Sequence, residues 1–339
     1  MHDPRNFEVN PATLQEERDA PKVSVLMPMR NAGPYLAAAI ESILAQDYPR
    51  LELVIVDDGS TDGSREYVSG LRDPRIFLYD GPRSGISACM NVALDRAIGE
   101  LVMRCDADDL YPPGRIRRQV AWLNARPDFI AVCGSFCMIG KSGQVVAAPL
   151  AQMTVELPDA QQWIQDRRLR THLCTFAVRL TAARRLGGFR PWFETAEDID
   201  FALRLASEGL IGYQPADAYQ YRLHSDSITH TQASVRRQFF EAAAIAMSQE
   251  RRAGGQDALM RGEAPALPST DGAGSRPDEA GKHIAQLLIG QAWQAFQRGD
   301  RAASRLHAWR AVRACTSYFD AWKSLLLVCF KPLPKTSSR

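Results

Sequence analysis

Three carboxylates stand within four residues directly after a short apolar run. Residues 101–105 have the composition of a buried strand, and Asp106, Asp108 and Asp109 follow it at once. Carboxylates this close repel one another unless a cation or hydrogen-bond donors hold them. Mg2+ and Mn2+ prefer oxygen ligands and take one or two of them from the protein, so the group suits such a cation. A polar turn would use the same residues, because Asp is common in turns.

A second acidic turn follows another apolar run. Residues 51–56, with the sequence LELVIV, are predicted to be a buried strand, and Asp57 and Asp58 come directly after it. Gly59 permits a tight turn there, and Thr61 or Asp62 can cap the helix that is expected next.

Strands and helices alternate along the first third of the chain. Strands are expected at 23–27, where Pro28 stops the run, and at 51–56, 75–79 and 101–105, with helices at 35–44 and 87–98. This order predicts a mainly parallel α/β sheet with helices on both faces. Ligands of such sheets bind beyond the carboxyl ends of the strands, so the two acidic turns are expected to share one edge. That clustering favours a metal and nucleotide site.

The following residues continue the pattern less regularly. Helices are expected at 115–124 and 198–206, and strands at 130–139, 172–178 and 219–223. The helix at 198–206 opens with the acidic pair Glu197 and Asp198. Negative charge at a helix N-terminus is favourable in itself, so the pair has a structural explanation as well as a chemical one.

Composition limits the class of protein. The chain has 339 residues and a formal net charge of +2, which argues against nucleic acid as a partner of the whole protein. Its seven Cys are odd in number and form no paired CxxC arrangement, which favours reduced thiols in the cytoplasm and no zinc site. Residues 1–20 contain no apolar stretch typical of a secretory signal, and no apolar run approaches the ~20 residues that span a bilayer.

Changes in composition predict the domain organisation. Residues 1–21 are expected to form an irregular lead-in, and 22–250 a main domain with a first half at 22–110 and a second at 111–250. Residues 251–282 hold six Gly, three Pro and no aromatic residue, which is typical of a flexible linker. A helical C-terminal extension is expected at 283–331.

The C-terminal extension is basic and aromatic. From Arg298 onward nine Lys or Arg stand against two Asp, and Trp and Phe residues are interleaved with them. A helical bundle with a solvated basic face explains the pattern. Peripheral contact with an anionic membrane surface, such as the inner face of the cell membrane, explains it as well.

Seven motifs in order give residues 22 to about 230 a resemblance to the family 2 inverting glycosyltransferases of the GT-A fold. The motifs are KVSVLMPMRN, VIVDDGSTDGS, SGISACMNVAL, CDADDLYPPGRI, GGFRP, AEDIDFALRL and YRLHSDSIT. The resemblance implies a GT-A fold and transfer of a sugar from a nucleotide-diphosphate sugar, in the first place a UDP-sugar. The acceptor would be a hydroxyl of a glycan or lipid-linked molecule in surface polysaccharide or glycan synthesis.

The resemblance also implies roles for particular residues. The donor nucleotide and diphosphate would be bound by Pro28, Arg30, Asp58, Asp106 and Arg222. Mn2+ or Mg2+ would be held by Asp108, Asp106 and His224, with Asp106-Ala107-Asp108 as the family's DxD motif.

The reaction itself is assigned to the start of the expected helix at 198–206. Asp198 matches the family's catalytic base, which takes the proton of the acceptor hydroxyl as that oxygen attacks C1 of the sugar and inverts it. Glu197 and His172 would contact the acceptor or orient groups around it.

One departure from the family bears on the donor. Met90 stands before Asn91 where the family often has Arg, so Arg83, Arg104 or Arg222 would have to replace that charge. A degenerate subunit that binds a nucleotide sugar without turnover is the alternative. A dinucleotide-dependent oxidoreductase is set aside, because no G-x-G-x-x-G motif follows the first expected strand.

Overall fold

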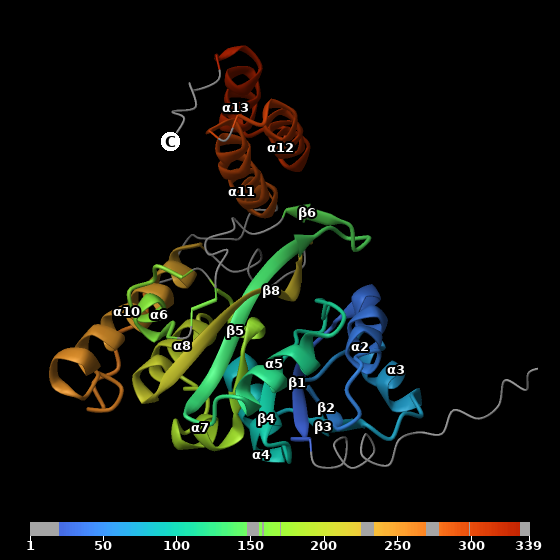
Figure 1. The fold of residues 1–339 in the computed structure, drawn as a ribbon, viewed down its shortest axis with the longest axis vertical. Coiled ribbons are helices and arrows are strands. Elements are labelled where there is room, and N and C mark those ends of the chain that lie inside the picture. The colour runs from blue at the N-terminus through green and yellow to red at the C-terminus, as the bar shows by residue number, and fades with distance from the viewer. Residues whose placement is uncertain are drawn as a thin grey trace, which may run out of the picture. The chain divides into compact units, whose positions relative to one another are not determined.

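The computed structural model describes residues 20–147, 156–157, 159–169, 171–224, 234–268, 278–297 and 299–332 (Figure 1). Its strands are β1 Val23–Met29, β2 Leu51–Asp57, β3 Ile76–Asp80, β4 Leu101–Arg104, β5 Phe129–Ile139, β6 Val145–Ala147, β7 Ala177–Arg179 and β8 Leu210–Arg222. Its helices are η1 Gly33–Tyr35, α2 Leu36–Leu44, α3 Ser64–Gly70, α4 Ile86–Arg96, α5 Arg115–Asn124, α6 Gln161–Gln165, η2 Leu173–Thr175, α7 Leu180–Arg185, α8 Glu197–Glu208, α10 Ser234–Gly254, α11 Asp278–Gln297, α12 Arg301–Ala314 and α13 Phe319–Phe330.

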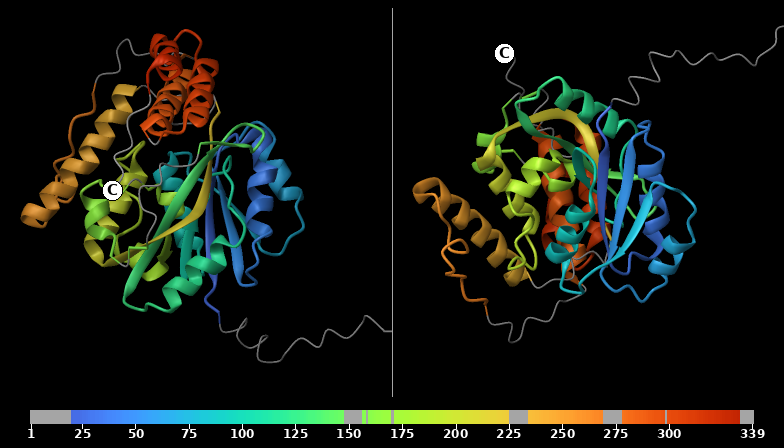
Figure 2. Two further views of the ribbon diagram at one scale, coloured as in Figure 1. Left: turned by 45° about the horizontal axis from the view of Figure 1, so that its top comes forward. Right: turned by 90° about the horizontal axis from the view of Figure 1, so that it is seen from below.

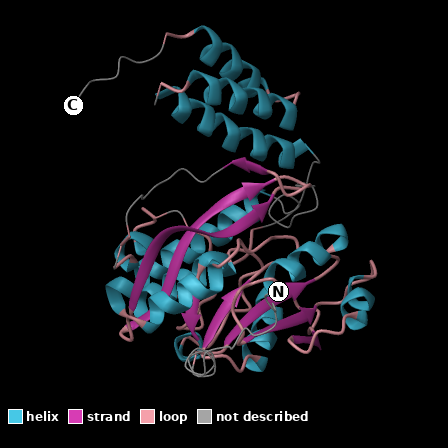
Figure 3. Ribbon diagram, turned by 45° about the vertical axis from the view of Figure 1, so that its right-hand side comes forward, coloured by secondary structure: helices cyan, strands magenta, loops and turns pink. Residues whose placement is uncertain are grey.

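The strands form one sheet of mixed direction (Figure 3). The order is β3-β2-β1-β4-β7-β5-β6, with β8 beside β5. Strands β1 to β4 pair in parallel, whereas β7 is antiparallel to β4 and to β5, and β6 is antiparallel to β5. The predicted α/β sheet flanked by helices is confirmed, but its strand directions are mixed, whereas the sequence predicted a mainly parallel sheet. The antiparallel part arises where the alternation of strand and helix stops and a tight turn joins β5 directly to β6.

Both faces of strands β1, β2 and β4 are buried. Leu26, Val54 and Val102 point to one face, where they pack in a core cluster with residues of α4 and α8. Their neighbours Val25 and Leu53 point to the opposite face and are also buried. The apolar runs at β1, β2 and β4 are therefore continuous because each strand is covered on both sides.

Strand β1 continues through Pro28, where the sequence predicted that it would stop. The nitrogens of Leu26 and Pro28 point to the same side in an extended chain, and that side faces β4. Pairing with β4 covers only residues 23–26 of β1, so the N–H group that Pro28 lacks has no strand opposite it. On the other side, Pro28 lies opposite Val56 of β2.

The chain divides into two compact units, each built from separate segments. Unit 1 comprises residues 1–136, 152–220 and 240–264, and unit 2 comprises 137–151, 221–239 and 265–339. Helix α10 lies in a stretch for which the sequence predicted no element, and it ends inside the segment 251–282. The predicted linear domain boundaries and the linker remain predictions.

Unit 2 contains a bundle of three helices, α11, α12 and α13 (Figure 2). The space between them is filled mostly by small and aliphatic side chains and by one aromatic ring, namely Ala285, Leu288, Ala292, Phe296, Ala308, Ala311, Val312, Cys315, Ala321 and Val328. None of the helices in the described ranges has the length and apolarity needed to cross a bilayer.

Candidate active site

The carboxyl ends of β1, β2 and β4 meet at one edge of the sheet in unit 1. The Asp58 N–H donates to the Met29 carbonyl oxygen over 2.8 Å, and the Cys105 N–H donates to the Leu26 carbonyl oxygen over 3.0 Å. These bonds tie both acidic turns to the end of β1. The structure therefore places Asp58 and Asp106 at the edge where Pro28 and Arg30 also lie.

The carboxylate of Asp58 is buried and organises the loop after β3. Its oxygens accept hydrogen bonds from the backbone N–H groups of Arg83, over 2.7 Å, and Gly85, over 3.2 Å. The loop approaches so closely that a Cβ at Gly81 would lie 2.8 Å from Asp58 Oδ1, which only glycine avoids. Asp58 thus fixes the shape of the loop. A hydrogen bond from a nucleotide base would be a third one to the same carboxylate.

A buried guanidinium links the turn after β4 to helix α8. Arg104 Nε donates to Asp106 Oδ1 over 2.7 Å, and Arg104 Nη1 donates to Glu197 Oε1 over 2.9 Å. From the sequence, Arg104 is expected only as a possible replacement for the Arg charge that Met90 lacks. An Arg inside an otherwise apolar strand, just before carboxylates, is the signal that could have identified it.

The two carboxyl groups on Arg104 titrate differently. Burial raises the pKa of the Glu197 carboxyl to about 7, and the charge of Asp198 beside it adds to the rise. Burial acts in the same direction on Asp106, but the charge and hydrogen bond of Arg104 outweigh it, so the Asp106 pKa lies below its usual range. Arg104 therefore stabilises the charge of Asp106 more than that of Glu197.

The candidate base Asp198 lies on the first turn of α8, next to His172. The Asp198 Oδ2 atom is 3.7 Å from His172 Nε2. Because His172 Nδ1 accepts the Cys174 N–H over 3.3 Å, a neutral imidazole carries its proton on Nε2, facing Asp198. Ala196, just before α8, has a left-handed φ of 60°, which costs about 1 to 2 kcal/mol in a residue with a Cβ. Strain of this kind is concentrated at functional sites.

Tyr219 of β8 contacts both His172 and the acidic turn after β4. Its ring stacks on His172 with a centroid distance of 5.9 Å. Its hydroxyl donates to Asp109 Oδ2 over 2.7 Å and accepts the Asp106 N–H over 3.0 Å. Asp109 is buried, so it is the structural member of the three carboxylates.

Replacing Tyr219 by Phe is expected to lower the free energy of unfolding by about 1 to 3 kcal/mol. The change leaves the buried Asp109 carboxylate without the hydroxyl donor and the Asp106 N–H without its acceptor. Urea unfolding followed by circular dichroism measures the loss. Tyr67→Phe, at an exposed tyrosine of α3, is the control and should change stability by less than about 0.5 kcal/mol. Equal stability of both variants would contradict the structural role of the hydroxyl.

Arg222 and His224 lie in unit 2. Arg222 Nη1 donates to the carbonyl oxygens of Gly140 and Lys141 over 3.0 and 2.9 Å. His224 is buried. Their predicted contacts with diphosphate and metal remain predictions.

The carboxylates after β4 have oxygen atoms of the kind that a divalent cation binds. In the described ranges, no three His, Cys, Asp or Glu side chains are grouped so that they could hold an ion by themselves. Asp106 and Asp108 offer hard oxygen ligands from a single turn. Mg2+ or Mn2+ takes one or two carboxylates and completes its shell with water and phosphate, so the residues present fit such an ion bound together with a diphosphate.

Met90 is part of the core. It is buried in the same cluster as Leu26 and Val102, and it borders a small cavity that Arg104 also lines. The residue that departs from the family pattern thus contributes apolar packing against β4.

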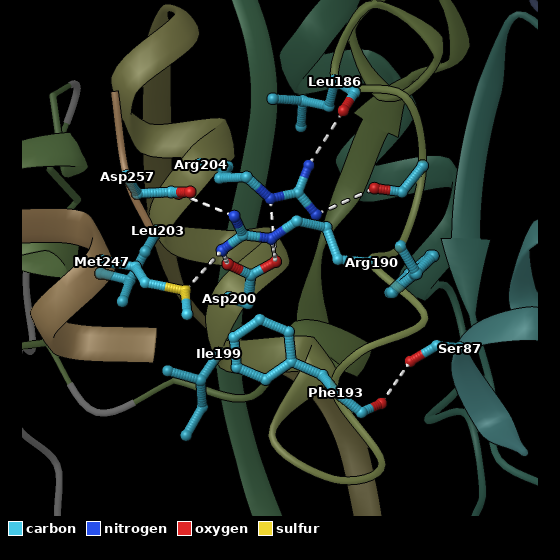
Figure 4. A network of polar contacts seen from close by, with 12 residues as sticks. Ser87, Leu186, Arg190, Phe193, Ile199, Asp200, Leu203, Arg204, Met247 and Asp257 are labelled. Atoms are coloured by element: carbon cyan, nitrogen blue, oxygen red, sulfur yellow. Dashed lines mark hydrogen bonds and ion pairs between the residues drawn. The ribbon is translucent and has the colours of Figure 1, made fainter. Parts of the chain in front are cut away.

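A second charge network holds the helix that carries Asp198 (Figure 4). Asp200, which is fully buried, pairs with Arg190 and with Arg204. Arg204 also donates to the carbonyl oxygens of Leu186 and Gly188, and Arg190 reaches Asp257 over 2.7 Å. The network fastens the first turn of α8 to the loop after α7 and to the segment after α10.

Comparison with known proteins agrees with this arrangement. The sequence model of Glycosyl transferase family 2 matches residues 24–181. EpsE of Bacillus subtilis, by name a glycosyltransferase, is 33% identical over 215 residues, which cover 61% of this chain and 74% of EpsE. TuaG of Bacillus subtilis, by name a glycosyltransferase of teichuronic acid biosynthesis, is 28% identical over 62% of this chain and 82% of TuaG.

The fold is shared with solved structures. TarS 1–349 from S. aureus, in a crystal structure with UDP-GlcNAc, superposes with a TM-score of 0.58 over 86% of this chain and 81% of that chain, at 18% identity. The match to EpsE covers about three quarters of that protein, and the sheet has the order and the acidic edge described above. The chain therefore belongs to glycosyltransferase family 2 and has the GT-A fold.

Proposed function

We propose that the protein transfers a sugar from a UDP-sugar to a hydroxyl of a glycan or lipid-linked acceptor, with inversion at C1 and with Mn2+ or Mg2+. The observation that carries the proposal is Arg104, whose guanidinium bonds both Asp106 at the end of β4 and Glu197 beside Asp198. One buried group thus ties the candidate diphosphate side to the candidate base. The name of the TarS complex, with UDP-GlcNAc, and that of TuaG support the donor class and a role in polysaccharide synthesis.

The donor would lie across the ends of β1, β2 and β4. Pro28 and Arg30 would contact the nucleotide and Asp58 would accept a hydrogen bond from the base. Asp106 and Asp108 would hold the cation, whose chemistry is to neutralise charge on the departing diphosphate. The roles of Arg222 and His224 at the diphosphate are part of the same proposal.

The acceptor would be activated at α8. Asp198 Oδ2 would take the proton of the acceptor hydroxyl while that oxygen forms a bond to C1 of the sugar. The bond between C1 and the phosphate oxygen breaks, and its electron pair leaves with the diphosphate. His172 would orient the Asp198 carboxylate, and Arg104 would hold Glu197 beside it.

Removal of the metal is expected to abolish donor binding. A screen of UDP-sugars by thermal shift with Mn2+ should raise the melting temperature for the correct donor, because that donor binds only the folded state. EDTA should cancel the shift, and added Mn2+ or Mg2+ should restore it. A shift of equal size in EDTA would contradict the metal requirement.

Asp108→Ala is expected to lose the metal-dependent shift in the same assay. Asp95→Ala, at an exposed Asp of α4, is the matched control and should keep it. Turnover distinguishes the enzyme from a subunit that only binds, because the enzyme releases UDP when donor and a cell extract containing acceptor are both present.

A further inference from the structure

The bundle in unit 2 exposes an unusual number of large apolar side chains. Seven side chains of α12 and α13 are between 39% and 81% exposed, namely Leu306, Trp309, Phe319, Trp322, Leu326, Leu327 and Phe330. The bundle already has a buried core of its own, so these residues are not needed to hold its three helices together. Large exposed apolar areas mark surfaces that bind something.

Helix α13 is apolar on both sides. Ala321, Ser324 and Val328 face the bundle core. Phe319, Trp322, Leu326 and Phe330 follow one another at spacings of three and four residues, so they form one continuous outward stripe. A helix that only closed a bundle would carry polar residues on that stripe.

Helix α12 extends the same surface. Arg305 of α12 donates to the Cys329 carbonyl oxygen of α13 over 3.3 Å, so this side of α12 borders α13. Leu306 and Trp309 are exposed next to Arg305 and one turn beyond it. We call the outward side chains of these two helices, with their basic neighbours, the bundle surface.

Helices α12 and α13 and the residues around them carry a net positive charge. Between residues 299 and 332 there are six Lys or Arg and two Asp, a net charge of +4. Arg305, Arg313 and Lys323 are exposed among the apolar side chains. One of the two acidic residues, Asp300, is engaged as the N-cap of α12, where its side chain accepts the Ala303 N–H.

We propose that the bundle surface docks on an anionic lipid bilayer, with its Trp, Phe and Leu side chains in the interface and its Lys and Arg side chains at the headgroups. Charge decides between the candidate occupants. The cores of protein interfaces are depleted in Lys, and a symmetric dimer through this surface would bring two sets of positive charges together. An anionic bilayer attracts every one of them and accommodates aromatic rings at its interface.

The mode of binding is peripheral. No helix in the described part of the chain can span a bilayer, whereas a helix with an apolar stripe and basic flanks binds in the interface plane. The inference does not depend on which donor or acceptor the enzyme uses.

The test is flotation of the full chain with vesicles of phosphatidylglycerol and phosphatidylcholine, compared with vesicles of phosphatidylcholine alone. The protein is expected to float with the anionic vesicles at low salt, and to float less at high salt because salt screens the attraction. The triple variant Phe319→Ser, Leu326→Ser, Phe330→Ser should reduce the partition coefficient by more than about tenfold. The triple variant Tyr67→Ser, Ile98→Ser, Met260→Ser, at exposed apolar residues of unit 1, is the matched control and should float normally.

A charge variant keeps the test decisive if the apolar triple variant folds poorly. Arg313→Glu with Lys323→Glu changes two exposed side chains and should remove most of the salt-dependent binding. Wild-type protein that stays unbound with anionic vesicles at low salt would overturn the proposal. Flotation of the apolar and charge variants at the wild-type level would also overturn it. A third contradicting result would be that no form floats, while the wild-type protein forms a concentration-dependent dimer that the variants convert to monomer. Because no nucleotide sugar is present, these results are independent of the proposed reaction.

Discussion

Replacing Asp198 by Asn is expected to abolish sugar transfer while donor binding stays close to normal. Asn has nearly the same shape but cannot take the proton of the acceptor hydroxyl, so the rate should fall by a factor of roughly a hundred or more, equivalent to about 2.7 kcal/mol or more of transition-state stabilisation. Transfer is measured as release of UDP with acceptor present, and donor binding as the thermal shift with Mn2+. The two measurements separate chemistry from binding.

The control for Asp198→Asn lies on the same helix. Glu208→Gln changes an exposed carboxylate at the other end of α8 and should leave both measurements unchanged. If Asp198→Asn weakens donor binding as much as transfer, the residue supports the site structurally and another group is the base. The anomeric configuration of the product, read by NMR, should be inverted relative to the donor.

Replacing Asp200 by Asn is expected to give the largest loss of stability, about 3 to 5 kcal/mol. Asp200 is fully buried between Arg190 and Arg204. Asn would leave Arg204 without its carboxylate partner, and Arg190 would share its remaining partner, Asp257, with Arg251. When one member of a buried ion pair is removed, the other remains as a buried charge without a partner, which strongly destabilises the fold. Urea unfolding of the full chain measures the change.

An exposed pair provides the control for Asp200→Asn. Asp47 pairs with Arg117 at 2.9 Å, and both side chains are more than half exposed. Asp47→Asn should cost less than about 1 kcal/mol, because water screens such a pair. Comparable losses for the two variants would show that the Asp200 network does not stabilise α8 as its burial implies.

Local patterns predicted the parallel half of the fold well. The apolar runs at β1, β2 and β4 and the turn residues after them are local features, and helix α5 has the bounds that its apolar spacing predicts. The antiparallel position of β7 could not be predicted, because nothing in three residues specifies that their partners are β4 and β5. Helix α10 was missed although its residues include many strong helix formers, which was an available signal.

The residue types of the candidate site could be predicted from the sequence, but the contacts between them could not. Carboxylates after strands or at the start of a helix are visible as residue types, so Asp58, Asp106 and Asp198 could be selected from sequence. Their partners could not, since Arg104 meets Glu197 across 93 residues and Tyr219 meets Asp109 across 110 residues. Such pairs depend on tertiary packing that sequence spacing does not encode.

The antiparallel position of β7 has a consequence for the order in which the protein can be completed during synthesis. Strand β4 lies between β1, which is made well before it, and β7, which follows it by more than seventy residues. A chain that leaves the ribosome N-terminus first therefore presents one side of β4 unpaired until Arg179 has emerged. An unpaired apolar strand edge is a template for association with other chains. Once it is made, Arg179 holds β7 in place, because its guanidinium donates to the carbonyl oxygens of Leu123, Arg126 and Phe129. The edge of β4, next to the acidic turn, is thus open to association with other chains during this period.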